Sequence, residues 1–224
     1  MNKRHSLMCM GIGLYLMVTC GMAAGAGGVA VAPKISTLGV GGDVIVGVVK
    51  DLNLRGGGNW LSVDYDGTFS DIDYQTQIDL LSYSLLADWY CFGGSFRISG
   101  GVLYNQNEAG LLGTPAGTID IGGDTYAAAD VGTLTGRLTC EQEIAPYVGI
   151  GWGNALAEKG RVGLMFDIGV VYTDSPTIAL TASGPIAGDP TFQQSLAREL
   201  RDLQDQANDF KWYPVLSLSL YIRF

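Results

Sequence analysis

The sequence predicts an all-β protein: a closed antiparallel up-and-down transmembrane β-barrel of eight strands, with a short helix in a long loop. Several segments alternate strictly between apolar and other residues, as strands with two unlike faces do. Aromatic residues stand at the ends of the apolar rows and aliphatic residues fill the middles, which is typical of a wall that faces lipid. After the N-terminal segment there is no run of about 18 apolar residues, so no membrane-spanning helix is expected.

The N-terminal segment has the layout of a secretory signal peptide. Lys3 and Arg4 precede an apolar stretch, and small residues with an Ala-x-Ala pattern follow up to Ala26. We therefore expect residues 1–26 to be removed, leaving a barrel domain over residues 27–224. A second Ala-x-Ala pattern would move cleavage as late as Ala32.

Two other interpretations of the N-terminal segment stay open. It could remain as an uncleaved membrane anchor, or it could be processed as a lipoprotein at Cys20, since the letters "MVTC" loosely resemble a lipobox. Loss of Lys3 and Arg4 with residues 1–26 would change the formal net charge from −9 to −11. An exported chain this acidic is a poor candidate for nucleic-acid binding.

Seven strands are predicted from the alternation. The last one ends the chain in "WYPVLSLSLYIRF", where every second residue is apolar. A closed up-and-down barrel needs an even number of strands, so an eighth must lie either at 27–35 or at 176–184. In the second strand the alternation blurs around Gly56–Gly58, where we expect a β-bulge. The seven predicted strands are 37–50, 52–65, 78–92, 95–106, 141–153, 161–173 and 211–224.

A water-soluble barrel or sandwich is the alternative, with its apolar rows turned inward. That arrangement does not explain why Trp89, Trp152, Tyr172 and Trp212 stand at row ends. It would also leave many glycines and other small residues on exposed strand faces, where they are weak strand formers. The membrane barrel explains both features.

The predicted connections differ in length. The letters "KDLN", "CFGG" and "NALAEKGR" are short connectors, which belong on the periplasmic side, whereas the long connections 66–77, 107–140 and 174–210 belong outside.

Two of the long connections carry structure of their own. The letters "GTIDIGGDTYAA" predict a small hairpin outside the membrane. In the third connection the period changes, and an amphipathic helix is expected that packs as a loop element or binds a partner. Its apolar residues at helical spacing are Phe192, Leu196, Leu200 and Leu203.

Charged residues lie on the rows that would face the lumen. Isolated charges in a narrow interior are costly, so we expect pairs and networks. They could serve as ligands for a solute or an ion, but structural ion pairing is the favoured interpretation. A barrel of about eight strands is filled by its own side chains and leaves no pore of porin size. The predicted lumen residues are Asp43, Asp88, Arg97, Glu143, Asp167, Lys211 and Arg223.

Three stretches resemble a known family. "EIAPYVGIGWGN", "LMFDIGVVYTDSPTIALTASG" and "DFKWYPVLSLSLYIRF" are similar to small Gram-negative outer-membrane β-barrels, among them the carbapenem-associated ornithine-uptake barrel. The resemblance covers about residues 37–224 and is strongest from 118 onward. It implies a monomeric, porin-like barrel of the cell envelope with a role in passing small amino acids. Its implied partners are outer-membrane lipid, the barrel-assembly machinery, periplasmic chaperones and a small solute.

The C-terminal strand also resembles an assembly signal. Leu218, Leu220, Ile222 and the terminal Phe224 match the β-signal that the barrel-assembly machinery reads in such proteins. The resemblance implies that the last strand is both part of the barrel wall and the signal that directs insertion into the membrane.

Nothing in the sequence indicates an enzyme. The single histidine, His5, lies in the predicted signal peptide, which leaves no imidazole for acid–base, nucleophilic or metal chemistry. No nucleotide-binding or metal-binding motif is present, and no catalytic, metal-binding or cofactor-binding residue is predicted. The expected function is an outer-membrane barrel with a narrow pathway for small solutes such as amino acids. The alternative is a structural or surface-interaction barrel without transport.

Two cysteines remain after removal of the signal peptide, and we predict that they do not pair. Cys91 ends a strand beside a short turn, whereas Cys140 follows a long loop, so they should lie at opposite rims. Rims separated by roughly 25 Å exceed the Cα separation of about 7 Å that a disulfide allows. Non-reducing mass spectrometry of the folded protein should find two free thiols. A 91–140 bridge would show that the strand directions are wrong.

Overall fold

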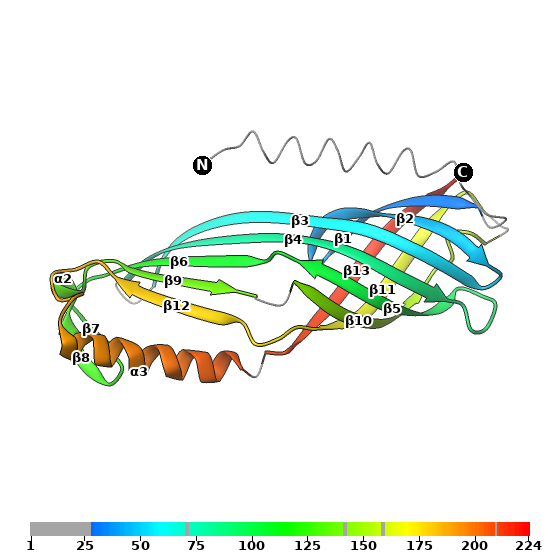
Figure 1. Cartoon of the computed structure of the whole chain (residues 1–224). Helices are drawn as coiled ribbons and strands as arrows, with labels where there is room; N and C mark the ends of the chain where they lie inside the picture. The colour runs from blue at the N-terminus through cyan, green and yellow to red at the C-terminus, as the bar shows by residue number, and fades with distance from the viewer. Residues whose placement is uncertain (1–27, 70–71, 141–142, 158–159, 209) are drawn as a thin grey trace.

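The computed structural model describes residues 28–224 except 70–71, 141–142, 158–159 and 209. The predicted signal peptide, residues 1–26, lies outside the described residues. One end of the molecule is a barrel with short turns, and the other is a long extension of the barrel wall (Figure 1).

Eight antiparallel strands close the barrel. The circle runs β1-β2-β3-β4-β5-β10-β11-β13 and closes through the pairing of β13 with β1. This confirms the predicted fold class. The barrel strands are β1 (Val29–Ser36), β2 (Gly39–Val49), β3 (Leu52–Phe69), β4 (Ile72–Trp89), β5 (Phe96–Asn105), β10 (Ile144–Trp152), β11 (Val162–Tyr172) and β13 (Trp212–Arg223).

The eighth strand is β1, at the first of the two predicted places. It pairs with β2 on one side and with β13 on the other, and the side chains of Ala30 and Ala32 are fully buried in the barrel. Cleavage after Ala32 would remove half of this strand, so only a cleavage site before Val29 would leave β1 whole. The second predicted place, 176–184, forms a strand outside the barrel.

The hairpin of β3 and β4 is the longest part of the wall. Each strand has 18 residues, and their register is continuous from Leu52↔Trp89 to Phe69↔Ile72. The bulge predicted at Gly56–Gly58 is therefore wrong. The irregular pairing lies in β2 between Gly47 and Val49, next to the turn in which Asp51 has a φ of 62°.

The outer surface of the barrel is an apolar belt between aromatic rims. Leu164↔Leu220 and Phe166↔Leu218 are neighbouring pairs of β11 and β13, and all four side chains point outward. At the outer rim Tyr172 and Trp212 stack edge-on with ring centroids 4.9 Å apart, and at the other rim Phe96 and Trp152 do so at 5.2 Å. A wall with this belt spans a membrane, and a closed barrel of this type lies in the cell outer membrane.

Helices do not contribute to this wall. Among the described residues, none of the helices is long and apolar enough to cross a membrane.

Three further strands extend the wall beyond the outer rim. β6 (Glu108–Pro115) pairs with the outer half of β4, β9 (Leu134–Thr139) pairs with β6, and β12 (Thr177–Ala182) pairs with β9. The result is an extracellular sheet in the order β3-β4-β6-β9-β12, continuous with the barrel (Figure 1).

The predicted hairpin and helix both belong to this extension. The hairpin consists of β7 (Thr118–Ile121) and β8 (Asp124–Ala127), and a short helix α2 (Ala128–Val131) follows it. Helix α3 (Pro190–Ala207) begins after Asp189, whose carboxylate accepts hydrogen bonds from the backbone N–H groups of Thr191 and Phe192.

Helix α3 packs its apolar face on the extension, as a loop element. Phe192 and Leu196 are buried against Ile121 of the hairpin and Val131 of α2. Leu134, Leu180 and Ala182 of the sheet complete this small extracellular core.

Cys91 and Cys140 are both free thiols, as predicted. Cys91 follows β4 at the end with the short turns, and Cys140 follows β9 in the extension.

The apolar belt makes a depth-dependent prediction. Leu218→Arg places a cation in the lipid-facing belt and should lower the free energy of unfolding by about 2–4 kcal/mol if the site lies near the bilayer midplane. Gln77→Arg is the matched control, because Gln77 lies on the same outward face in the aqueous extension and should cost less than about 0.5 kcal/mol. Urea unfolding in lipid vesicles measures both, and equal penalties would argue against a membrane-spanning wall.

Candidate functional site

The lumen of the barrel is filled by three layers of side chains. An outer apolar layer lies toward the extracellular side and an inner apolar layer toward the periplasmic side. Charged residues lie between them: along β11, Met165 belongs to the inner layer, Asp167 to the charged layer and Val171 to the outer layer. The outer layer is Leu38, Leu86, Leu103, Ala145, Tyr147, Val171 and Val215, and the inner layer is Ala30, Ala32, Ile45, Ala155, Met165 and Tyr221 with Leu156 against it.

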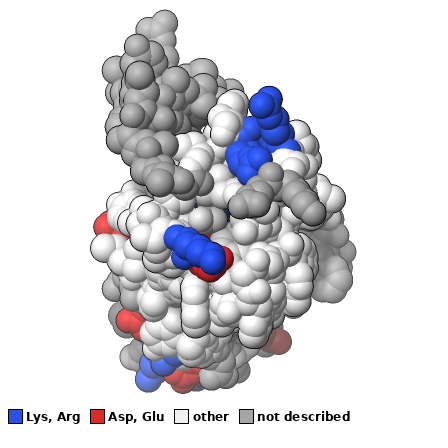
Figure 2. Space-filling model, turned by 90° about the vertical axis from the view of Figure 1, so that its right-hand side faces the viewer, with Lys and Arg blue, Asp and Glu red and all other residues white. Residues whose placement is uncertain are grey.

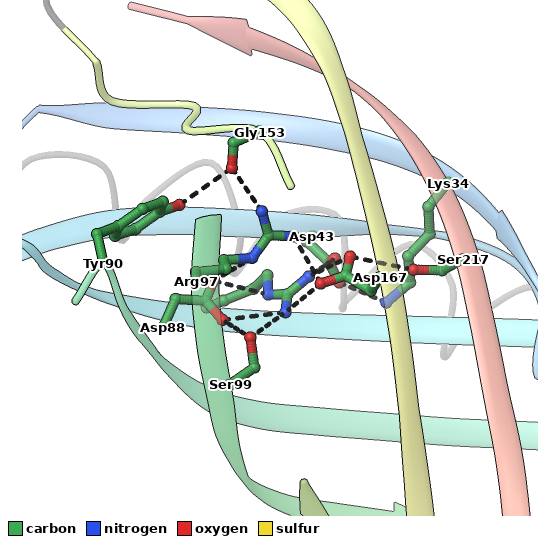
Figure 3. Close-up of polar contacts among 10 residues, drawn as sticks. Lys34, Asp43, Asp88, Tyr90, Arg97, Ser99, Gly153, Asp167 and Ser217 are labelled. Carbon is green, nitrogen blue, oxygen red and sulfur yellow. Dashed lines mark hydrogen bonds and ion pairs between the residues drawn. The ribbon is translucent and has the colours of Figure 1, made fainter. Parts of the chain in front are cut away.

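Arg55 is the centre of the charged layer. Its Nε lies 3.0 Å from Asp88 Oδ2, and its Nη2 donates to Asp88 Oδ1 at 3.0 Å. Its Nη1 donates to Asp167 Oδ2 at 3.1 Å and lies 3.6 Å from Asp43 Oδ2. The guanidinium of Arg55 on β3 thus joins carboxylates from β4, β11 and β2. These three carboxylates, Asp88, Asp167 and Asp43, are labelled in Figure 3.

Two further cations complete the set. Lys34 Nζ lies 2.6 Å from Asp43 Oδ1, and Arg97 Nη2 lies 2.6 Å from Asp167 Oδ1. We call these six residues, Lys34, Asp43, Arg55, Asp88, Arg97 and Asp167, the lumen cluster.

Neutral groups donate further hydrogen bonds to the cluster or accept them from it. Ser99 Oγ donates to Asp88 Oδ1 at 2.6 Å, and Ser217 Oγ donates to Asp167 Oδ2 at 3.2 Å. Arg97 Nη1 donates to the backbone carbonyl of Gly153, which also accepts from the Tyr90 hydroxyl at 3.4 Å (Figure 3).

The lumen cluster is electrically neutral and buried. It contains three cations and three carboxylates, so its formal charge is zero. The exposed fraction is 0% for Arg97 and 3% for Arg55. Buried charges are costly unless they are paired, and each charged residue of the cluster has at least one ion-pair partner. Among the buried atoms of the cluster in the described part of the chain, only Asp43 Oδ2, Arg55 Nε and Arg97 Nε lack a hydrogen bond. A neutral cluster of paired charges is suited to holding strands together rather than to attracting an ion.

Glycines on the lumen face make room for the cluster. A Cβ on Gly57 would overlap with Asp43 Oδ1, and one on Gly151 would lie 2.7 Å from Asp167 Oδ1. Gly56, on the lipid-facing side, has no atom within 4 Å of its hypothetical Cβ. The high glycine content of the strands therefore has a steric cause where large charged side chains cross the lumen.

The seven charged residues predicted for the lumen fall into two groups. Asp43, Asp88, Arg97 and Asp167 meet in the lumen cluster. The other three, Glu143, Lys211 and Arg223, lie elsewhere.

These three residues lie at strand ends. Glu143 is exposed at the start of β10, and Lys211 is half-buried just before β13. Arg223 lies at the periplasmic end, where it donates to the backbone carbonyls of Leu156 and Ala157. None of the three is an ion-pair partner of the lumen cluster in the described part of the chain.

Two members of the cluster were missed from the sequence, Lys34 and Arg55. Lys34 was missed because the sequence left two possible places for the eighth strand, and only one of them contains Lys34. Arg55 was missed because a bulge was expected right after it. An unbroken alternation from Asn53 to Asn59 would have placed Arg55 on the lumen face.

A small cavity lies beside the cluster. Its volume is about 30 Å³, and Lys34, Arg55, Asn59, Ser84 and Tyr147 are among its lining residues. One water molecule needs about 10–15 Å³ on this scale, so the cavity has room for roughly two. Within the described residues, Asn59 Oδ1 and Ser84 Oγ have no hydrogen-bond partner, and both are suited to binding such waters.

The periplasmic end of the barrel is closed by its own chain. The turn after β10 places Ala155, which is fully buried, and Leu156 in the inner apolar layer. Viewed from this end, the described surface consists mainly of uncharged side chains with a few small groups of basic and acidic ones (Figure 2).

A second polar cluster ties helix α3 to the extracellular hairpin. The buried Ser195 hydroxyl donates to Asp124 at 2.7 Å and lies 2.8 Å from the Tyr126 hydroxyl, and Arg198 also donates to Asp124. The hydrogen bonds from Ser195 and Arg198 lower the pKa of the Asp124 carboxyl below its ordinary value. These contacts orient the helix on the hairpin.

No group of three or more His, Cys, Asp or Glu side chains in the described ranges could hold a metal ion.

Comparison with solved structures identifies the fold. CarO from Acinetobacter baumannii matches with a TM-score of 0.62 and 20% identity, over 88% of this chain and 98% of that one. CarO2 from the same organism matches with a TM-score of 0.63 at the same identity and coverage. The chain has the CarO barrel fold. The resemblance to small outer-membrane barrels that the sequence indicated is thus confirmed at the level of fold.

A third solved structure is less similar to this chain. A major outer membrane protein from Thermus thermophilus is similar at a TM-score of 0.40 and 16% identity, over 89% of this chain and 100% of that one. No protein-family model matches the chain, and no curated protein matches it.

The lumen cluster predicts a large stability effect at Arg55. Arg55→Met leaves three buried carboxylates with two cations and should lower the free energy of unfolding by about 3–5 kcal/mol. Arg137→Met is the matched control, because it breaks a 3.0 Å pair with Glu108 in which both side chains are largely exposed, and it should cost less than about 1 kcal/mol. Tryptophan fluorescence during urea unfolding gives both values. Similar small losses would show that the cluster does not support the barrel.

Proposed function

We propose that this protein is a non-conducting outer-membrane barrel that presents its extracellular sheet and helix for interaction at the cell surface. The closed lumen is the observation that carries the proposal. Apolar layers lie above and below the lumen cluster, and the cavity beside it has room for only about two water molecules.

The chemistry of the lumen cluster supports a structural role. Each carboxylate is paired with at least one cation of the cluster, so no charge is left to bind a charged solute. A pathway would need the cluster to open, and opening would expose charges to an apolar layer on each side.

The extracellular extension supports the interaction role. It has its own buried core and its own polar cluster, so it has a defined tertiary structure and is not merely a set of loops. Elements that project far from a rigid barrel and keep a defined shape are suited to binding at a surface.

A small-solute pathway is the second candidate. It is favoured by the unpaired Asn59 Oδ1 and Ser84 Oγ, which face a cavity also lined by Lys34 and Asp167. These groups would bind the polar ends of a small solute such as an amino acid if the outer apolar layer moved aside.

Catalysis is not part of the proposal, because residues 27–224 contain no histidine. We further propose that Leu218, Leu220, Ile222 and Phe224 serve as the assembly signal. The first three face lipid on the last strand and are accessible to an insertion machinery.

Conductance separates the two candidates. Purified wild-type barrel in a planar bilayer should show no stepwise conductance and no current that depends on added amino acids, while an open porin in the same membrane conducts. Swelling of liposomes in isotonic amino-acid solutions should likewise stay at the level of protein-free vesicles. Solute-dependent conductance or swelling would contradict the closed-lumen proposal and establish the pathway.

A further inference from the structure

The outer part of β3 is a free sheet edge. β2 pairs with β3 only as far as Val40↔Trp60, and beyond this point the described part of β3 pairs with β4 alone. In the extension, β3 is the border strand on the side away from α3 (Figure 1).

The backbone groups on this edge point outward in a defined order. A Cβ on Gly39 would lie 2.6 Å from the Trp60 carbonyl oxygen, so that carbonyl points to the β2 side. Backbone groups alternate between the two sides of an antiparallel strand. The N–H and C=O groups of Ser62, Asp64 and Asp66 therefore point to the open edge.

The two faces beside the edge differ sharply. On the face continuous with the lumen, Val63 and Tyr65 are 41% and 67% exposed, and Ile78 of β4 is 36% exposed beside them. The opposite face carries Asp64 and Asp66, and Asp79 of β4, which accepts from Ser62 Oγ at 2.6 Å.

The charge beside the edge is of one sign. Residues 61–81 contain five aspartates and neither lysine nor arginine. A strand added to this edge would place its own side chains directly beside Val63 and Tyr65 on one face and beside Asp64 and Asp66 on the other. Cross-strand pairs are stabilised by apolar contact on the first face and by opposite charge on the second.

We infer that this edge, residues 62–67, docks an extended peptide segment in which apolar and basic side chains alternate. The segment would add to the sheet as a further antiparallel or parallel strand, with backbone hydrogen bonds to Ser62, Asp64 and Asp66. The inference rests on the proposed function and names the chemistry of the partner. A second copy fits less well, because pairing β3 with β3 would bring aspartates of both copies together.

The test uses the full chain folded in detergent micelles and two labelled, end-capped octapeptides. One alternates valine and lysine, and the other alternates valine and glutamate. Fluorescence anisotropy should show saturable binding of the valine–lysine peptide that weakens as salt is raised, and no saturable binding of the other.

Two substitutions at one position separate charge from backbone. Asp64→Asn removes the charge and should weaken binding about two- to fivefold. Asp64→Pro also removes the edge N–H, while the ladder to β4 stays intact because that N–H faces away from it, and binding should fall at least tenfold. Asp205→Asn removes an exposed charge of α3 and should leave binding unchanged.

Heat-dependent gel mobility verifies that each variant is folded. The inference would be overturned by equal binding of both peptides, by absence of binding to the wild type, or by unchanged binding to Asp64→Pro. The aspartates would then serve only to protect an unpaired strand edge. Concentration-dependent self-association without peptide binding would overturn it in favour of a second copy. A conducting barrel that still binds the peptide would overturn the proposed function alone.

Discussion

The ion-paired guanidinium of Arg55 is the interaction on which the barrel interior depends. It joins carboxylates from β2, β4 and β11, and through them Lys34 of β1 and Arg97 of β5. Ser217 of β13 bonds to the same set, and Arg97 reaches the carbonyl of Gly153 at the end of β10. Seven of the eight barrel strands are thus linked through side chains in the lumen, and the residue directly after β10 is joined to them. The ion pairs and hydrogen bonds of the interior therefore support the closed circle of backbone hydrogen bonds.

The composition of the strands follows from this arrangement. Six long or charged side chains share a narrow lumen, so the positions around them must be small, and Gly57 and Gly151 show how closely the charged groups approach the backbone. On the outer face the constraint is the opposite one, because lipid offers no hydrogen bonds and large apolar side chains are stabilising there. Lumen and lipid together produce the alternation of small or polar residues with large apolar ones.

The same sheet changes its surroundings along its length. Within the membrane, β3 and β4 have lipid on one side and the packed lumen on the other. Beyond the rim their outward row becomes polar and acidic, with Ser62, Asp64 and Asp79, whereas the lumen-side row stays apolar and meets α3 only at the far strands. The interaction surface that we propose therefore lies outside the membrane, where the extension has an apolar side and a free edge.

The sequence by itself determined the barrel class, most strand positions, the lipid-facing rows and the helix around Phe192 and Leu196, because each of these depends on local periodicity. It also placed four of the six cluster residues on the lumen face. The tertiary structure decided which charges meet, since pairing depends on the stagger between strands and on closure of the circle, neither of which alternation encodes. In the structure, the predicted lumen residues Glu143, Lys211 and Arg223 lie outside the cluster, whereas Lys34 and Arg55, which were not predicted, belong to it. It also decided that β1 closes the barrel and that β12 extends the sheet outside it, because two apolar segments of similar length compete for one place and only pairing on both edges distinguishes them.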